Sequence, residues 1–175
     1  MPPSISAPSS TKNRQNERDP AMHQTKKSNQ WYFGMTAHIG VNSQTKLIHS
    51  VAATAANVHD RQVLPELPHG QETRVGGDAA YSVQCDVIRQ HAPKAKSFVQ
   101  TPVHRHRPLS EAQRARNRTK SKVRAKVEHA FLVITRVVGW TKVRYRGLAQ
   151  NTHWLQISCG LANLYVARRR LLAGV

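Results

Sequence analysis

The stretch Trp31-Tyr-Phe-Gly-Met-Thr-Ala-His-Ile-Gly-Val41 decides the fold. Its odd-numbered positions are all apolar, and they alternate with the tyrosine, glycine, threonine and histidine of the even positions. A period of two residues is typical of a β-strand with one buried face. Residues 42–46 follow as a turn, and residues 47–54 as a second run rich in β-branched side chains. We therefore predict an antiparallel hairpin.

Two short helices are expected after this hairpin. Asn57 can cap a helix over residues 58–67, with Pro65 keeping that helix short or broken. Ser82 can cap another helix, which ends near Pro93.

Short strands and longer helices complete the chain. Strands are predicted over residues 73–75 and 97–100. Apolar residues at helical spacing predict a long amphipathic helix that begins at Ser110 or Thr119 and ends at Val138. Residues 103–118 are basic and aperiodic, as in a mobile connection, and a last helix follows Asn151.

This order of elements favours an α/β fold with a mixed sheet flanked by helices. Residues 1–30 are rich in Pro, Ser, Asn, Gln and Lys and lack an apolar period, so they are interpreted as loop or extended coil. Residues 31–175 are interpreted as one domain.

Composition points to a polyanionic partner. The 175 residues include 27 Lys and Arg against 9 Asp and Glu, a formal net charge of +18. Such a charge predicts salt-sensitive binding to nucleic acid. Two cysteines do not make a disulfide framework or a Cys-based zinc site, and no apolar run is long enough to span a bilayer. We expect a cytoplasmic protein that acts at the chromosome.

Two acids stand out against this basic background. Asp78 follows Gly76 and Gly77 at a strand end, where ligands commonly bind, although a plain turn explains the same tripeptide. Glu128 borders the apolar stripe of the long helix, although a simple ion pair with Arg124 explains it equally well. Because Mg²⁺ prefers oxygen ligands together with phosphate, the two carboxylates are candidate ligands for a metal ion at a nucleic-acid strand.

Several motifs, in order along the chain, resemble the bacterial insertion-sequence transposases of the DDE class, and more specifically insertion-sequence family five. They are Ala7-Pro-Ser-Ser-Thr-Lys-Asn13, Arg18-Asp-Pro-Ala-Met-His-Gln-Thr-Lys-Lys27, Gln30-Trp-Tyr-Phe-Gly-Met35, Ala37-His-Ile-Gly-Val41, Thr54-Ala-Ala-Asn-Val-His-Asp60, Gly77-Asp-Ala-Ala-Tyr81, Arg124-Ala-Lys-Val-Glu-His129, Thr141-Lys-Val-Arg-Tyr-Arg-Gly-Leu148 and Ala162-Asn-Leu.

The resemblance implies a ribonuclease H-like catalytic domain, three catalytic acids and two Mg²⁺ ions, with Mn²⁺ as an alternative. Matched by motif, Asp78 is the second acid, Glu128 is the third, and Arg124 is the arginine of the signature. A lysine that is typical after the glutamate is replaced here by Thr135, with Arg136 beside it as a substitute.

The first acid of the family falls at about Met1, and residues 1–6 contain no acid. The resemblance therefore implies the C-terminal portion of a transposase with an incomplete ribonuclease H-like sheet. The nearest other acids, Asp19 and Asp60, are interpreted as a loop residue and a helix-start residue.

Basic side chains in the second half of the chain are the candidate DNA contacts: Arg105, Arg107, Arg114, Arg116, Arg118, Lys120, Lys122, Lys126, Arg136, Arg144 and Arg146. Trp31 and Trp154 could stack on bases, but their apolar faces favour packing in the core.

Two functions from different classes follow from these residues. The first is Mg²⁺-dependent cleavage and transfer of DNA strands, with this chain inactive alone because the first aspartate is missing. The alternative is a noncatalytic DNA-binding or regulatory remnant. The expected partners are element ends and target DNA, together with a homo-oligomer or a full-length transposase.

Overall fold

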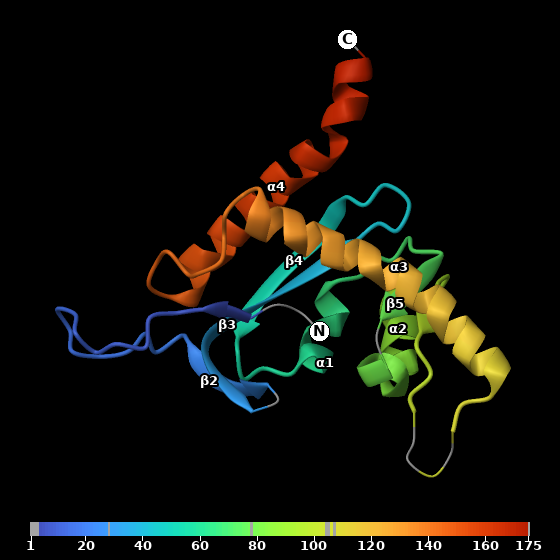
Figure 1. Ribbon diagram of the computed structural model, residues 1–175, viewed down its shortest axis with the longest axis horizontal. Coiled ribbons are helices and arrows are strands. Elements are labelled where there is room, and N and C mark those ends of the chain that lie inside the picture. Colours follow the sequence, from blue (N-terminus) through green and yellow to red (C-terminus); the bar gives the residue numbers. More distant parts are fainter. Residues whose placement is uncertain (1–3, 28, 78, 104–105, 107, 175) are drawn as a thin grey trace.

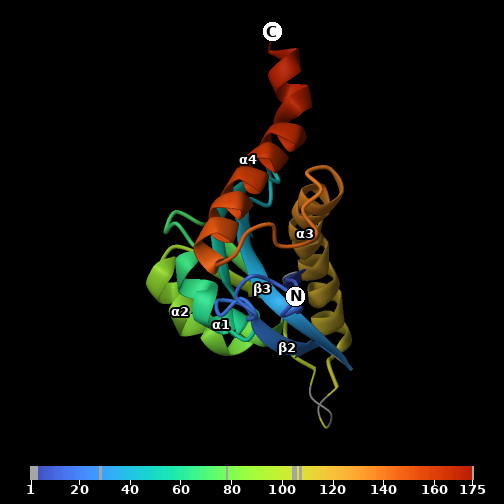
Figure 2. The same ribbon diagram turned by 90° about the vertical axis from the view of Figure 1, so that its left-hand side faces the viewer.

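The computed structural model describes residues 4–27, 29–77, 79–103, 106 and 108–174. Strands form a central layer, and helices lie on both sides of it (Figure 1 and Figure 2).

The predicted hairpin is confirmed. Strand β3 (Gln30–Val41) pairs antiparallel with β4 (Ile48–Ala55), from Met35 opposite Ala55 to Val41 opposite Ile48. The turn between them lies at residues 43–45.

The expectation that β3 buries only one face is wrong for its middle. Residues 34–39 are all buried, and Met35, Ala37 and Ile39 belong to the main core. Thr36 and His38, on the other face, are only 3% and 2% exposed. The His38 Nε2 atom is hydrogen-bonded to the Thr54 hydroxyl at 3.0 Å, which offsets the cost of burying a polar ring. Helices on both sides of the sheet explain why alternation alone understates this burial.

The loop expected over residues 1–30 is also corrected, since two strands within it pair with β3. Strand β1 (Ser4–Ser6) lies on one edge of β3, and β2 (His23–Lys27) follows β4 along the other edge. Gly34 permits the close approach of β1, because a Cβ there would lie 2.0 Å from the Ile5 carbonyl oxygen.

The single mixed sheet that we expected is instead two sheets. The short strands predicted near residues 73–75 and 97–100 are confirmed as β5 (Arg74–Gly77) and β6 (Lys96–Val99), and they pair in parallel with each other. Among the described strands, residues 37–41 of β3 pair only with β4, and β5 pairs only with β6. No described strand connects the two sheets.

The short helices begin later than expected. His59, and not Asn57, caps the first of them: its Nδ1 atom accepts a hydrogen bond from the Arg61 N–H at 3.2 Å. Ser82 lies inside a 3₁₀ turn, and the helix after it begins at Cys85, where the N-cap residue Gln84 makes no side-chain hydrogen bond. The elements are α1 (Asp60–Val63), η1 (Leu64–Glu66), η2 (Ala79–Gln84) and α2 (Cys85–His91).

The long helix α3 (Glu111–Arg136) takes the earlier of its two predicted starts. Ser110 and Gln113 form a reciprocal capping box at its N-terminus. Residues 111–118 are therefore helical, and the connection that we expected over residues 103–118 is shorter. Helix α4 (Leu148–Ala173) begins three residues before Asn151, which is buried in its first turn.

Helices α3 and α4 pack on the hairpin and form the main core. Ile134 of α3, Leu155 of α4 and Trp140 between the helices join the buried β3 side chains. Asn163 fixes α4 to β4, because its amide donates to the Ile48 carbonyl and accepts from the Ile48 N–H, each at 2.8 Å.

The two tryptophans expected in the core differ. Trp154 is half-buried and packs against the core, as predicted. Trp31, at the start of β3, is 67% exposed, and the Lys26 ammonium lies 5.9 Å from its ring centroid.

Candidate active site and nucleic-acid interface

The first part of the candidate site is the end of β5. Gly76 and Gly77 end the strand, and η2 begins at Ala79. A Cβ at Gly77 would lie 2.9 Å from the ring of Tyr81, so glycine lets η2 turn back tightly against the strand. Asp78 lies between these segments and outside the described residues.

Glu128 forms the second part, one turn beyond Arg124 on α3. Its Oε1 atom accepts a hydrogen bond from the Arg124 guanidinium at 3.3 Å, so the predicted i, i+4 ion pair is present. The Glu128 side chain is 65% exposed. An exposed pair of this kind contributes about 0.2–0.5 kcal/mol, and breaking it costs little.

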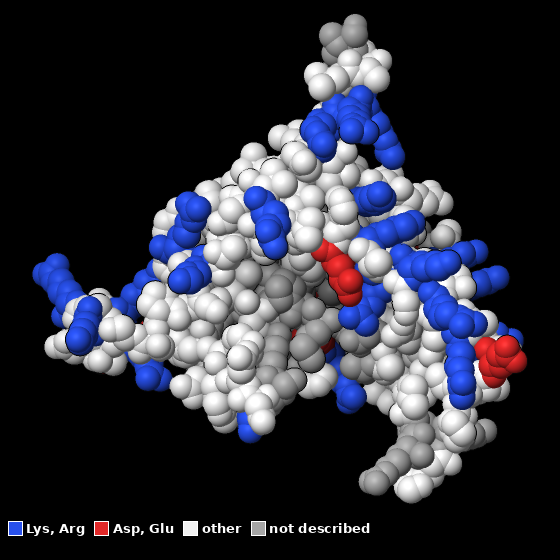
Figure 3. Space-filling view, in the orientation of Figure 1, with Lys and Arg blue, Asp and Glu red and all other residues white. Residues whose placement is uncertain are grey.

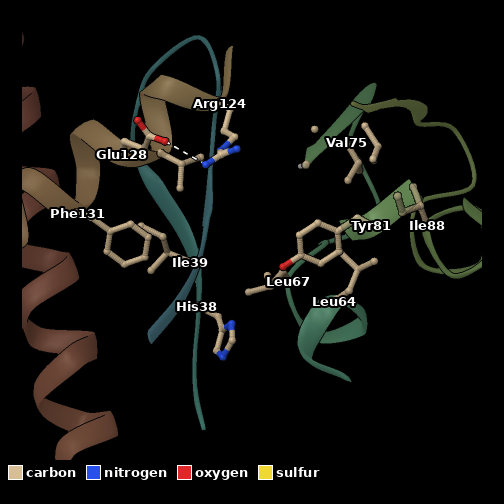
Figure 4. A pocket seen from close by; sticks show the side chains of 14 residues that line it. His38, Ile39, Leu64, Leu67, Val75, Tyr81, Ile88, Arg124, Glu128 and Phe131 are labelled. Atoms are coloured by element: carbon tan, nitrogen blue, oxygen red, sulfur yellow. Dashed lines mark hydrogen bonds and ion pairs between the residues drawn. The ribbon is translucent and has the colours of Figure 1, made fainter. Parts of the chain in front are cut away.

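A single cleft brings the two parts together. Gly76, Gly77, Arg124 and Glu128 all line it. Figure 4 shows Arg124 and Glu128 across the cleft from Val75, the residue before Gly76. The sequence reasoning placed these segments near one another only by analogy, because 50 residues separate positions 78 and 128.

The lining of this cleft is mostly apolar. Ile39 of β3 and Val75 of β5 lie on opposite sides of it, Leu64 and Phe131 complete its walls, and His38 of β3 adds a polar ring (Figure 4). The cleft therefore coincides with the gap between the two sheets. Among the described lining residues, only Arg124 and Glu128 are charged, so phosphate and metal are best held where these two side chains lie.

Basic residues form two rows along α3, each with a spacing of four residues. One row is Arg116, Lys120 and Arg124, and it leads to Glu128 at the cleft. The other row, Arg114, Arg118 and Lys122, is exposed to solvent. Figure 3 shows Lys and Arg side chains gathered along this helix.

Two of the predicted DNA-binding lysines also hold the fold together. The Lys120 ammonium donates to the Val99 carbonyl at 2.6 Å, which joins α3 to β6. Lys126 donates to the carbonyl of Ser43 in the hairpin turn. Arg136 is exposed near the end of α3. Arg105 and Arg107 lie outside the described residues.

Arg144 and Arg146 lie on a separate loop that is rigidly held. Asn151 accepts hydrogen bonds from the N–H groups of Arg144 and Tyr145, at 3.2 and 3.3 Å, and donates to the carbonyls of Tyr145 and Gly147, each at 2.7 Å. Arg144 stacks over the ring of Trp154 at 4.9 Å. Arg146 donates to the side-chain oxygen of Gln15.

Asp19 and Asp60, the other two acids considered as metal ligands, have structural roles away from the cleft. Asp19 accepts hydrogen bonds from the N–H groups of Ala21, at 3.0 Å, and Gly147, at 2.7 Å, and so connects its loop to the start of α4. Asp60 opens α1. Neither residue lines the cleft that contains Glu128.

Residues 4–164 match the family model described as the transposase DDE domain. This chain belongs to the DDE transposases. The match includes both sides of the cleft, all of α3 and residues 148–164 of α4. No solved structure matches the chain.

Membership gives a DDE transposase its general chemistry, which is phosphoryl transfer on a DNA substrate with the help of divalent metal. The predicted transposase family is thereby confirmed. In the part of the chain that the structure describes, no helix is both long and apolar enough to cross a membrane.

Sequence reasoning missed three residues that shape the functional regions of this transposase. His38 and Tyr81 line the cleft, and Asn151 holds the arginine loop. Asn151 gave a signal, since an asparagine within the first turn of a long helix often bonds to nearby backbone groups. His38 gave no such signal, because it occupies a polar position of an alternating strand, which is expected to face solvent.

Proposed function

We propose that this chain is the catalytic portion of an insertion-sequence transposase of family five, which cleaves and joins DNA strands with Mg²⁺. Mn²⁺ is the expected alternative ion. The observation that carries the proposal is the shared cleft: Gly77, immediately before Asp78, and Glu128 both line it. The ribonuclease H-like class of the domain is part of the same proposal.

Asp78 and Glu128 are the residues that would hold the metal. The donor chemistry fits at Glu128, whose carboxylate is exposed, borders the cleft and carries one weak contact to Arg124. When bound, divalent ions supply activation of the attacking hydroxyl and stabilisation of the leaving oxygen.

The weak Arg124–Glu128 ion pair suits a site in which both side chains exchange each other for a ligand. A DNA phosphate at the rim can accept two parallel hydrogen bonds from the guanidinium, whereas Glu128 accepts a single one at 3.3 Å. Arg124 then holds the strand, and the Glu128 oxygens are released to bind a cation. The row through Lys120 and Arg116 extends this contact along the DNA backbone.

The same cleft supports the proposal that this chain alone is a weak catalyst or none. Glu128 is the one acid among the described lining residues, Asp78 would be the second, and Asp19 and Asp60 lie elsewhere. By the family resemblance the first acid falls at about Met1, where this chain has no acid, so a third carboxylate would have to be supplied to the cleft by an added segment.

The test is Mg²⁺-dependent nicking and joining on the ends of the cognate element. The full chain is compared with and without an added polypeptide that contains an Asp-bearing strand. Activity that appears only with this addition, and that Asp78→Asn and Glu128→Gln each abolish, supports the proposal. Glu111→Gln, which removes another acid of the same helix, is the matched control and should retain activity. Activity that survives Glu128→Gln would overturn the assignment.

The alternative, a noncatalytic DNA-binding remnant, is favoured by the single acid among the described cleft residues. It predicts DNA affinity that persists in the Asp78→Ala, Glu128→Ala double variant, with no cleavage under any complementation. A homo-oligomer or a full-length transposase would then be its functional partner.

A further inference from the structure

Three metal-ligating side chains meet away from the cleft rim described above. His49 lies on β4, while His69 and Glu72 lie on the segment between η1 and β5. One ligand atom from each lies within 4.8 Å of the others. The cluster therefore joins the antiparallel sheet to the segment that leads into the parallel one.

A β-bulge aims His49 at this cluster. Gly40 pairs with Ser50, and Val41 with Ile48, so His49 is the extra residue on β4. Bulges re-aim side chains and are common beside functional sites. The imidazole lies over Gly40, where a Cβ would come within 2.6 Å of the ring, so the glycine makes room for it.

The other two ligands are held by their own loop. Glu72 accepts hydrogen bonds from the backbone N–H groups of His69, at 2.6 Å, and Gly70, at 2.9 Å. Its side chain is only 12% exposed, and the His69 Nε2 atom lies 3.5 Å from Oε1. The His49 and His69 rings meet edge to face at 4.9 Å. The carboxylate is thus fixed before any ion arrives.

The protonation states suit metal binding. The pKa of His49 is lowered, chiefly because burial disfavours its charged form and also because His69 lies close, so its ring is neutral near pH 7. Burial would raise the pKa of Glu72, but the backbone hydrogen bonds outweigh it and lower that pKa, which leaves a carboxylate. The His49 Nδ1 atom is hydrogen-bonded to the Ser50 hydroxyl at 2.7 Å, and Nε2 is then the ligand atom.

We propose that His49, His69 and Glu72 bind one Zn²⁺ ion that clips β4 to the segment before β5. Two imidazoles and one carboxylate suit Zn²⁺, whereas Mg²⁺ prefers oxygen ligands, so this site differs in chemistry from the one proposed at Glu128. Zinc–nitrogen bonds of about 2.1 Å bring tetrahedral ligands to about 3.4 Å from one another. The two histidines are solvent-accessible and can rotate by this small amount. Water takes the fourth position.

This clip would hold the start of β5 in place relative to β4. The two sheets share no described strand pairing, so a bond through metal is a direct link between them. The inference does not rest on the proposed function, since it concerns the fold and another ion.

The test is zinc binding by the full, metal-stripped chain, measured by competition with a chromophoric chelator and by native mass spectrometry. We expect one Zn²⁺ per chain, and visible Co²⁺ absorption typical of a four-coordinate site. His49→Gln, His69→Gln and Glu72→Gln should each weaken binding about ten-fold or more. His153→Gln, which changes an exposed histidine of α4, should leave it unchanged.

Two results would overturn the inference. One is no stoichiometric zinc binding in the wild-type chain. The other is equal affinity in His49→Gln and the wild type, which would confine any ion to the loop and remove the link between the sheets. Glu72→Gln keeps an acceptor for only one of the two loop hydrogen bonds, because His69 and Gly70 donate to different Glu72 oxygens. His49→Gln, which leaves these loop hydrogen bonds intact, is therefore the variant that tests the metal contact alone.

Discussion

Asn151 shows how much one buried side chain holds in this molecule. It is fully buried and satisfies four backbone groups of the loop that carries Arg144 and Arg146. Asn151→Ala leaves those groups without partners, so we expect a loss of about 3 kcal/mol in the free energy of unfolding. Chemical denaturation measures it. Gln150→Ala, at an exposed neighbouring position, should change stability by less than about 0.5 kcal/mol.

His49 predicts a pH dependence of its own. Its folded-state pKa lies below the unfolded value of 6.5, so the unfolded chain binds more protons as the pH falls below 6.5. The metal-free protein should therefore lose stability from about pH 6.5 downward. Glu72, whose pKa is lowered from 4.5, adds a second loss that begins only below about pH 4.5. The thermal midpoint of the wild type minus that of His49→Gln should therefore fall as the pH is lowered from 7 to 5; a constant difference over this range would contradict the prediction.

Among the helices and strands, those with a regular apolar period could be predicted from the sequence. The alternation of residues 31–41 gave β3, and helical spacing with Ser110 gave α3. It could not give β2, whose residues His23-Gln-Thr-Lys-Lys27 are polar and pair at a sheet edge, where no burial pattern is needed. His59 in place of Asn57 was missed because a ring nitrogen is an uncommon cap.

The two rows on α3 predict where DNA lies. Arg116 and Arg124 belong to the row that leads to Glu128, whereas Arg114 and Arg118 belong to the outer row. With about six phosphate contacts, the log–log salt slope should be near −5. Arg116→Ala and Arg124→Ala should each lower DNA affinity and reduce this slope by about 1. Fluorescence anisotropy at several salt concentrations measures both. Arg114→Ala and Arg118→Ala remove the same charge from the outer row and should lower DNA affinity less. A larger loss of affinity in these two variants than in Arg116→Ala and Arg124→Ala would place the DNA on the outer row instead.

For the whole molecule, the division into two sheets is the feature that no local pattern could predict. The sequence predicted the short strand β5 correctly. Its pattern could not show that β5 and β3 belong to different sheets, because strand pairing depends on which other strand lies alongside. The same reasoning limits the site: the spacing of Gly77 and Glu128 along the chain does not reveal that one cleft joins them. Only the long-range packing of α3 across β3 and β5 brings them together.

This division predicts uneven stability. Strands β3 and β4 belong to the four-stranded sheet and to the main core, whereas β5 and β6 form a pair over a small cluster of Leu64, Ile88 and Val99. Local opening of a two-stranded unit costs less than global unfolding. Amide hydrogen exchange should therefore be at least about ten-fold faster in β5 and β6 than in residues 35–39 of β3. Adding Zn²⁺ should slow exchange in β5 more than in α4, because the proposed clip acts on the segment before β5. Uniform protection across both sheets would mean that they already unfold as one unit and that the gap between them does not weaken the fold.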